Sequence, residues 1–386
     1  MANLRDLGWA YFDAIVAAAP LRDVNPWRVR DETGSGGRAH PAYEPDDDTL
    51  ERLLGVPVHL RATSQSGVPA LALDVWVAYE LRRAGFHPDR VWPRASAPRV
   101  LPVEITEFIE RLPRKEQAEL WARIRRGQGG AGTANLLGKN YVKQVDVVMS
   151  SWATGPELMV STKRMDSSFG KNAANRVEES YGDAKNLRLR HPQAALGFVY
   201  ALSAVALETE PDIAAWLIDL LGKLGREEDA YDAVALVLPD LAAADEPADP
   251  APEEPAGPIE AGSAAEGDWS DDPRLFELPA SIAPGGGSAE GPGGGPLEDP
   301  GGGPTEAPPA PPGVATPQGL LAPSRPAVEI DTLPRVGLRR DEVPADLDPA
   351  RFFEVMCRRI LDNSPVNFHP EARRRRSQPR PVATLR

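Results

Sequence analysis

The sequence predicts an α/β fold with a central mixed β-sheet flanked by helices, a helical N-terminal region and a long disordered C-terminal linker. Apolar residues recur at helical spacing early in the chain, strand-like and amphipathic stretches alternate after about residue 141, and proline and glycine concentrate between residues 246 and 330. We therefore expect four segments: a mostly helical region (1–110), an α/β core (111–245), an acidic linker (246–330), and a C-terminal helix with an Arg-rich tail (331–386).

The first part of the chain carries three expected helices. Residues 3–18 have apolar side chains near helical spacing. A second helix should cover residues 69–84, because Gly85 suits the left-handed conformation that often follows a helix. A third lies within residues 111–126. The helical region 1–110 is a candidate for recognition or dimerisation.

The core alternates strands and helices. Residues 145–149 and 157–163 are strand-like, and the turn at 154–156 separates them, so they should form a hairpin. Further along we expect a helix over 171–190, a strand over 194–202, a helix over 212–224 and a strand over 231–238. After the linker, Asp348 is a good N-cap for one more helix.

The net charge of −14 is unevenly distributed. Residues 246–330 hold 15 acidic residues, two arginines, 19 prolines and 15 glycines, so this segment carries −13 and has too few large apolar residues to fold. Residues 111–190 hold 15 basic and eight acidic residues, and their net charge of +7 suits a polyanionic partner. The tail, with arginines at 373–376, is either a DNA-attracting arm or a partner of the acidic linker.

Composition excludes several classes of protein. The single cysteine, Cys357, rules out a disulfide framework and a multi-cysteine metal centre, and it suits a reducing cytoplasm. The five histidines lack metal-ligand spacing, so we expect structural or surface roles for them. No signal peptide is evident, and no run of 18 apolar residues indicates a membrane span. We therefore expect a cytoplasmic protein.

The predicted hairpin brings an acid and a lysine together. Side chains alternate along a strand, so Glu157, Ser161 and Lys163 share one face, and Asp146 lies on the partner strand. An aspartate beside a lysine at the ends of paired strands is what a Mg²⁺-dependent phosphodiesterase needs. Mg²⁺ takes one or two carboxylates with waters and phosphate, and a lysine can orient the attacking water.

The segments Val145-Asp146-Val147-Val148 and Val160-Ser161-Thr162-Lys163 resemble the motif of the PD-(D/E)xK nuclease superfamily, which includes many type II restriction endonucleases. This resemblance covers about residues 140–205 and implies a restriction-endonuclease-like core. The chain departs from the pattern at Ser161, where an Asp or Glu is usual. A subset of these enzymes has Ser-x-Lys at this place, and the missing glutamate lies in the following helix.

Two glutamates of the following helix, Glu178 and Glu179, are candidates for the missing ligand. The inward stripe of this helix is expected to consist of Ala174, Val177, Tyr181 and Ala184. Glu178 lies at the edge of that stripe and Glu179 points more outward, so we favour Glu178. Glu157 is a third candidate, because it shares the face of Lys163 further along the strand.

The resemblance implies a Mg²⁺-dependent endonuclease that hydrolyses DNA phosphodiester bonds. Asp146 and Glu178 would hold the metal, together with the backbone carbonyl of Thr162. Lys163 would position the water for in-line attack, and Ser161 would fill the vacated acidic position. In some members an upstream helical glutamate also joins the site. Here Glu116 and Glu119 occupy such a helix, and an ion pair with Lys115 or Arg123 is the preferred interpretation.

Several residues near this motif are candidates for contacts with DNA. The Gly-rich loop 125–132 is basic, so it either wraps DNA or serves as a simple connector. Candidates for holding DNA phosphates are Arg164, Lys171, Asn172, Asn175 and Arg176, for which a solvated polar face is the alternative.

The function that we predict is restriction-type defence against foreign double-stranded DNA. Cutting both strands calls for a homodimer or a larger homo-oligomer, and a cognate DNA methyltransferase encoded nearby would protect the host. Two alternatives remain open at this point. One is a non-catalytic DNA-binding or assembly subunit with a nuclease-like fold, and the other is a DNA repair or recombination nuclease.

Overall fold

The computed structural model describes residues 3–19, 24–30, 40–126, 134–167, 169–241 and 328–381. These residues belong to one compact unit, to which the chain contributes from both sides of residues 251–324. Almost all of the predicted linker, and the predicted loop 125–132 after Arg126, lie outside the described residues. Among the described helices, none is long and apolar enough to cross a membrane.

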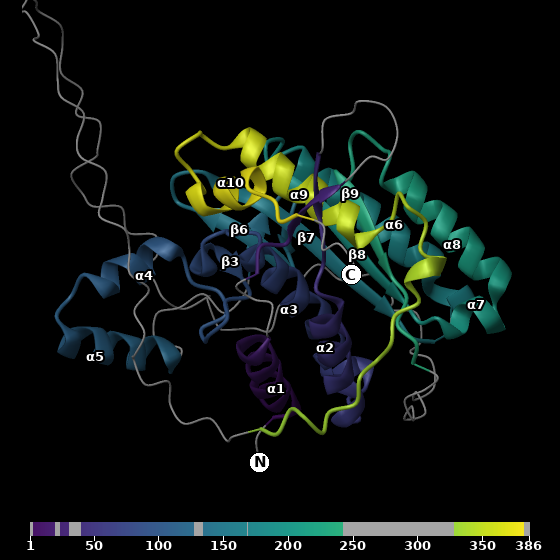
Figure 1. Ribbon diagram of the computed structural model, residues 1–386, viewed down its shortest axis with the longest axis horizontal. Coiled ribbons are helices and arrows are strands. Elements are labelled where there is room, and N and C mark those ends of the chain that lie inside the picture. The colour runs from purple at the N-terminus through teal and green to yellow at the C-terminus, as the bar shows by residue number, and fades with distance from the viewer. Residues whose placement is uncertain are drawn as a thin grey trace, which may run out of the picture. The chain divides into compact units, whose positions relative to one another are not determined.

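A five-stranded mixed sheet forms the centre of the fold (Figure 1). Its strands, in spatial order, are β3 (Val91–Trp92), β6 (Val147–Ser151), β7 (Gly155–Met165), β8 (Ala195–Leu202) and β9 (Ala233–Val237). The β3–β6 and β6–β7 pairs are antiparallel, whereas the β7–β8 and β8–β9 pairs are parallel. The structure thus confirms a mixed sheet flanked by helices.

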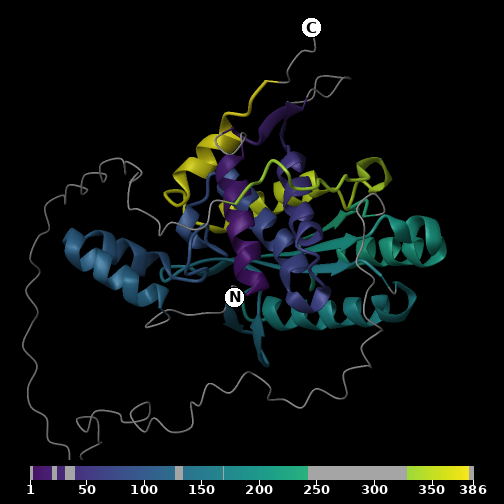
Figure 2. The same ribbon diagram turned by 90° about the horizontal axis from the view of Figure 1, so that it is seen from below.

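Helices cover both faces of the sheet (Figure 2). One face packs against α1 (Leu4–Ala18), α2 (Asp47–His59), α3 (Val68–Arg83) and α9 (Pro349–Asn363), and the other against α6 (Phe169–Arg188) and α8 (Pro211–Leu224). Neighbouring side chains of β7 therefore enter different layers. Leu158 and Val160 pack in the first, and Met159 packs in the second.

Shorter elements complete the described chain. Two small antiparallel sheets are β1 (Trp27–Arg30) with β2 (His40–Tyr43), and β4 (Asn135–Leu137) with β5 (Val142–Gln144). The remaining helices are η1 (Ser64–Ser66), η2 (Pro88–Arg90), α4 (Val103–Glu110), α5 (Arg114–Arg125), α7 (Val205–Thr209), η4 (Arg340–Glu342) and α10 (Pro370–Ser377).

The long predicted elements are confirmed, with shifts of a few residues at their ends. α3 ends before Gly85, whose φ of +100° is the left-handed conformation expected there. α9 begins after Asp348, whose carboxylate accepts a hydrogen bond from the Ala350 N–H. α5 (Arg114–Arg125) lies within the predicted range 111–126 and starts at Arg114, because Pro113 occupies its N-cap.

The segments predicted as separate regions share one core. Residues 1–110 contribute α1, α2 and α3 to one layer and β3 to the sheet, so the sheet extends beyond the predicted core 111–245. The C-terminal segment packs in the same layer through Phe352 and Phe353 of α9. Near its end, the Arg380 N–H donates to the Trp27 carbonyl and the Arg380 carbonyl accepts from Val29.

Arginines of the tail make contacts within the described chain. Arg373 donates to the carbonyls of Phe368, Leu361 and Ser364. Arg374 and Arg375 both pair with Glu371 at 2.7 Å. Arg376 lies over the Trp27 ring at 5.8 Å. Much of the positive charge on α10 therefore has a structural role, whereas its action on DNA stays a prediction.

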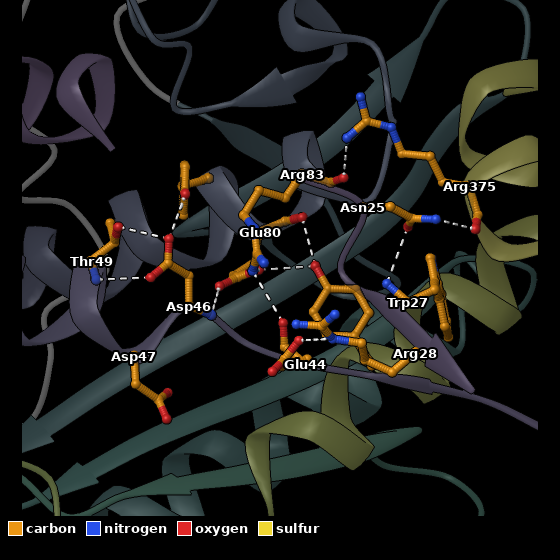
Figure 3. Close-up of polar contacts among 12 residues, drawn as sticks. Asn25, Trp27, Arg28, Glu44, Asp46, Asp47, Thr49, Glu80, Arg83 and Arg375 are labelled. Atoms are coloured by element: carbon orange, nitrogen blue, oxygen red, sulfur yellow. Dashed lines mark hydrogen bonds and ion pairs between the residues drawn. The ribbon is translucent and has the colours of Figure 1, made fainter. Parts of the chain in front are cut away.

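A buried polar network links β2, α2 and α3 (Figure 3). Glu80 accepts hydrogen bonds from Arg83 at 2.6 Å, from the Asp46 N–H at 2.7 Å and from the Tyr43 hydroxyl at 3.0 Å. Asp46 in turn accepts from the Tyr79 hydroxyl at 2.7 Å. Glu80 and Arg83 are 0% and 2% exposed, so this is an ion pair inside the core.

Candidate active site

The hairpin of β6 and β7 fixes Asp146 beside the end of β7. Asp146 immediately precedes β6, and its Oδ2 accepts a hydrogen bond of 2.8 Å from the Thr162 N–H. The Thr162 hydroxyl donates to Oδ1 of Asp74 at 2.6 Å. Asp74 lies on α3, so one residue of β7 ties together two acids that are 72 positions apart in sequence.

Lys163 points to the opposite face of β7, toward α6. Its Nζ lies 3.8 Å from Oε1 of Glu179, which is also 3.7 Å from Nζ of Lys143 on β5. Lys143 lies 2.5 Å from Oδ2 of Asp183, one turn further along α6. Two lysines and two carboxylates therefore form one cluster next to Asp146.

Two tyrosines border this cluster. The Tyr141 hydroxyl donates to Oδ1 of Asp183 at 3.0 Å. The buried Tyr231 hydroxyl donates to the Ser180 carbonyl at 2.9 Å. Burial raises the pKa of Tyr231, and a hydrogen bond with Ser161 has a smaller, lowering effect. Ser161 thus lies on the α6 side of the sheet, as the alternation with Lys163 predicts.

Burial makes ionisation of the two aspartates unfavourable. The pKa of Asp146 is raised mainly by burial, while the Thr162 N–H and the charges of Lys163 and Lys143 lower it. The pKa of Asp74 is raised well above its ordinary value, first by burial and then by the negative charge of Asp146. The two acids therefore compete for ionisation across Thr162.

The structure brings Glu179, rather than the favoured Glu178, to Lys163. The buried stripe of α6 follows residues one turn apart: Phe169, Ala173, Val177, Ser180, Ala184 and Leu187. Asp183 and Asn186 are buried beside it. Tyr181, which was expected inside, is 37% exposed, and the side chain of Ala174 lies outside the described ones. The helix is thus rotated relative to the predicted stripe. This turns Glu178 to the far side and Glu179 toward the strands.

Glu157, the third candidate, is engaged elsewhere. It lies near the start of β7, where it accepts hydrogen bonds from the Thr154 hydroxyl at 2.6 Å and contacts His369 Nε2 at 2.5 Å. Its pKa is lowered by the His369 and Thr154 hydrogen bonds, although burial opposes them. Glu157 therefore joins the C-terminal segment to the sheet, and His369 has the structural role expected for a histidine.

The candidate phosphate-binding residues are only partly described. Arg164 is largely buried and donates to Asp166 at 2.7 Å, so it has a local structural role. Asn175 is exposed and Arg176 is half-buried near Tyr200. The side chains of Lys171 and Asn172 are not among those that the structure describes.

Of the two upstream glutamates, Glu116 and Glu119, Glu119 forms the expected surface ion pair with Arg123 at 3.4 Å.

The donor chemistry fits a hard divalent cation that keeps part of its hydration. Asp146 and Glu179 both lie near Lys163, and Mg²⁺ needs only one or two protein carboxylates. In the part of the chain that the structure describes, no three or more His, Cys, Asp or Glu side chains are grouped as a metal site. Water and a substrate phosphate would have to complete the coordination.

Three residues of the site were missed from sequence: Asp74, Lys143 and Asp183. Asp74 had a signal, because it is the one charge within the apolar run from Val68 to Tyr79. Lys143 lies three residues before Asp146 on a strand too short to predict.

Comparisons of the chain with protein-family models, with curated proteins and with solved structures found no match.

Proposed function

We propose that the protein is a Mg²⁺-dependent endonuclease that hydrolyses DNA phosphodiester bonds, of the restriction type that defends against foreign DNA. The observation that carries the proposal is the approach of Glu179 to Lys163, beside Asp146. A glutamate on the helix after Ser-x-Lys is what the resemblance to the PD-(D/E)xK superfamily requires.

The proposed roles follow from the contacts of each side chain. Asp146 and Glu179 would hold the metal, which would polarise the phosphate and favour deprotonation of water. Thr162 orients Asp146 through its N–H, and its carbonyl is a further candidate ligand. Asp74, held by the Thr162 hydroxyl, is a positioning residue in this scheme.

Lys163 is the group proposed to act on the nucleophile. Its side chain is 24% exposed, so it can reach both Glu179 and a water molecule. An ammonium group at this place orients the water for attack on phosphorus and offsets the negative charge that grows on the phosphate. Lys143 supplies a second positive charge, and Asp183 keeps it in place.

The decisive experiment uses the purified full-length protein with unmethylated phage DNA and Mg²⁺ or Mn²⁺, followed by sequencing of the fragment ends. We expect cleavage that Asp146→Ala and Lys163→Ala reduce by at least about 100-fold, because each removes a group that acts in the transition state. Circular dichroism and DNA affinity should stay close to those of the wild type. Wild-type protein that never cuts any DNA would refute the proposal.

Glu178 and Glu179 offer a matched pair for the metal assignment. They are adjacent on α6 and both exposed, yet only Glu179 contacts Lys163. Glu179→Gln should reduce cleavage by at least about 100-fold and raise the Mg²⁺ concentration needed, whereas Glu178→Gln should leave both unchanged. Equal losses in the two variants would contradict the assignment.

One observation favours the non-catalytic alternative. Within the described ranges no preformed group of three metal ligands exists, and Lys143 and Lys163 are already neutralised by carboxylates. A DNA-binding or assembly subunit could keep this arrangement as a structural cluster. Salt-dependent binding of duplex DNA without cleavage at any Mg²⁺ concentration would support this second function.

A further inference from the structure

β4 and β5 form a two-stranded ribbon that leads directly to Asp146. The cross-strand pairs are Asn135 with Gln144, Leu136 with Lys143, and Leu137 with Val142. Side chains alternate between the two faces of such a ribbon, so the middle pair lies on one face and the two outer pairs lie on the other. In Figure 2 the ribbon extends away from the main sheet beside one end of α6.

The inner face holds the ribbon against the protein. Leu136 packs against the core on the α6 side of the sheet. Lys143 makes its contacts with Asp183 and Glu179 from this face. The ribbon is thus part of the candidate active site, and its position is coupled to that of Glu179.

The turn of the ribbon is fixed by Asn186 of α6. The Asn186 carbonyl accepts from the Lys139 N–H at 2.9 Å, its side-chain oxygen accepts from the Asn140 N–H at 2.8 Å, and its amide donates to the Tyr141 carbonyl at 3.1 Å. A Cβ on Gly138 would lie 2.1 Å from the Asn186 amide, so only glycine fits. An isolated two-stranded ribbon is marginally stable, and these contacts preorganise it.

The side chains of the outer face are exposed among the described residues, although the Leu137 carbonyl contacts His191 Nε2 at 3.0 Å. Leu137 and Val142 are 49% and 59% exposed and lie directly opposite each other. Asn135 and Gln144 form a second exposed pair one step closer to Asp146. A preorganised, exposed strip of two amides and two apolar side chains indicates a ligand-binding surface.

The chemistry of this strip matches the base edges of DNA. Asn and Gln can make paired hydrogen bonds to adenine, and apolar side chains contact the thymine methyl group. The major groove also admits a two-stranded β-ribbon. Residues 134–145 contain no acid, and Lys139 at the turn is exposed, so the free end of the ribbon complements the charge of the phosphate backbone, whereas Lys143 is paired on the inner face.

We propose that the outer face of the β4–β5 ribbon reads base edges in the major groove of double-stranded DNA. The expected distance between the ribbon and the cleaved bond rests on the proposed nuclease function, whereas the proposed recognition of bases by the ribbon does not. A strand advances about 3.3 Å per residue, so Val142 lies within about 13 Å of Asp146 along the chain. With base pairs stacked about 3.4 Å apart, the ribbon reads A·T pairs within about four base pairs of the cleaved bond.

The test is selection of bound duplexes from a randomised library by the full-length protein without divalent metal, read by sequencing. Wild type should enrich A·T pairs at one or more positions. Asn135→Ala/Gln144→Ala should reduce that enrichment about 10- to 100-fold while the salt-dependent affinity for unselected DNA stays within about threefold. Trp216→Ala, an exposed apolar residue on α8, is the matched control and should keep the wild-type preference.

The outcomes separate this inference from the proposed function. Cleavage with a sequence preference that the ribbon variants do not change would overturn the inference and leave the nuclease intact. A ribbon-dependent preference in a protein that never cuts would refute the nuclease and keep the inference. If Leu137→Ser/Val142→Ser instead dissociates an oligomer in sedimentation experiments without changing DNA selection, the face is an interface between copies and the inference is overturned.

Discussion

Two clusters of charged side chains, in different layers of the same unit, differ in how completely they are closed off from water. The network around Glu80 is fully buried, and each oxygen of its carboxylate accepts a hydrogen bond (Figure 3). The cluster around Lys163 is partly open, because Lys163 and Glu179 are 24% and 54% exposed and lie 3.8 Å apart. In the first cluster both carboxylate oxygens of Glu80 are satisfied, although the buried Arg83 Nε has no hydrogen-bond partner, whereas the second cluster is open enough to accept a ligand.

Electrostatics separate the two clusters further. Burial raises the pKa of Glu80 too, but Arg83 lies 2.6 Å away as its ionic partner inside the core, and Glu80 in turn raises the pKa of Arg83. In the candidate site, Asp74 and Asp146 face each other across Thr162, and burial raises the pKa of both. A site that keeps poorly compensated acids buried sacrifices stability for the ability to bind a cation. The comparison thus predicts opposite effects of substitution in the two regions.

The largest effect on stability is expected from Arg83→Met. It leaves Glu80 as a buried charge without its ionic partner, which should reduce the free energy of unfolding by about 3–5 kcal/mol. Urea unfolding followed by circular dichroism measures this loss. Arg123→Met, which breaks the exposed pair with Glu119, is the control and should cost less than about 1 kcal/mol. Similar losses of unfolding free energy in both variants would contradict the expected difference between the buried Glu80–Arg83 pair and the exposed Glu119–Arg123 pair.

Glu157 provides an intermediate case, because it is buried and paired with His369. Its lowered pKa means that its contacts stabilise the fold fully above about pH 4.5 and lose this contribution as pH falls through the folded-state value. Glu157→Gln should therefore cost about 1.5–3 kcal/mol at pH 7 and less at pH 3. Thermal unfolding at both pH values tests this, and a loss that is independent of pH would contradict it.

In the candidate site, Asp74→Asn should stabilise the protein. The pKa of Asp74 is higher in the folded protein than in the unfolded chain, so Asp74 ionises more readily when the protein is unfolded. The free energy of unfolding therefore falls as pH rises from the ordinary carboxyl pKa toward the folded-state pKa. Asparagine removes that charge and still accepts the hydrogen bond from Thr162. A gain of about 0.5–2 kcal/mol at pH 7 is expected, with less cleavage activity. Destabilisation at pH 7 would contradict the proposed competition with Asp146.

The smallest stability effect is expected for Lys163→Ala. Its ion pair with Glu179 is long and partly exposed, so its loss should change the free energy of unfolding by less than about 1 kcal/mol. The same variant should lose nearly all cleavage activity. A stability loss as large as that of Arg83→Met would mean that the Lys163 cluster is structural, and it would weaken the proposed function.

Hydrophobic periodicity was enough to predict the long elements of the fold, such as α3, β7 and α6. It could not predict β3, β4 and β5, because two or three residues do not establish a period. Which of Glu178 and Glu179 lies beside Lys163 could not be predicted for a related reason. Ser180 is buried in α6 through its hydrogen bond to the Arg176 carbonyl, and a polar residue inside the stripe hid the true rotation of the helix.

The hairpin that places Asp146 beside Thr162 and Lys163 could be predicted from two neighbouring strand-like runs, but the long-range contacts could not. The lone charge within an apolar run marks Asp74 as unusual, but no local pattern reports that its helix packs under β7 and brings it to Thr162. Asp183 and Lys143 meet because the β4–β5 ribbon folds back onto α6. Such contacts depend on tertiary packing, so they could be found only from the structure.

The packing of α9 under the sheet implies that the fold is built from two pieces of chain. Phe352 and Phe353 lie in the same core as β8 and β9, and His369 and Arg380 bond to Glu157 and Trp27 on the other side of residues 242–327. The covalent connection between residues 241 and 328 is therefore dispensable in principle for holding the core together. A gene divided within that interval should yield two polypeptides that recognise each other and reconstitute one domain.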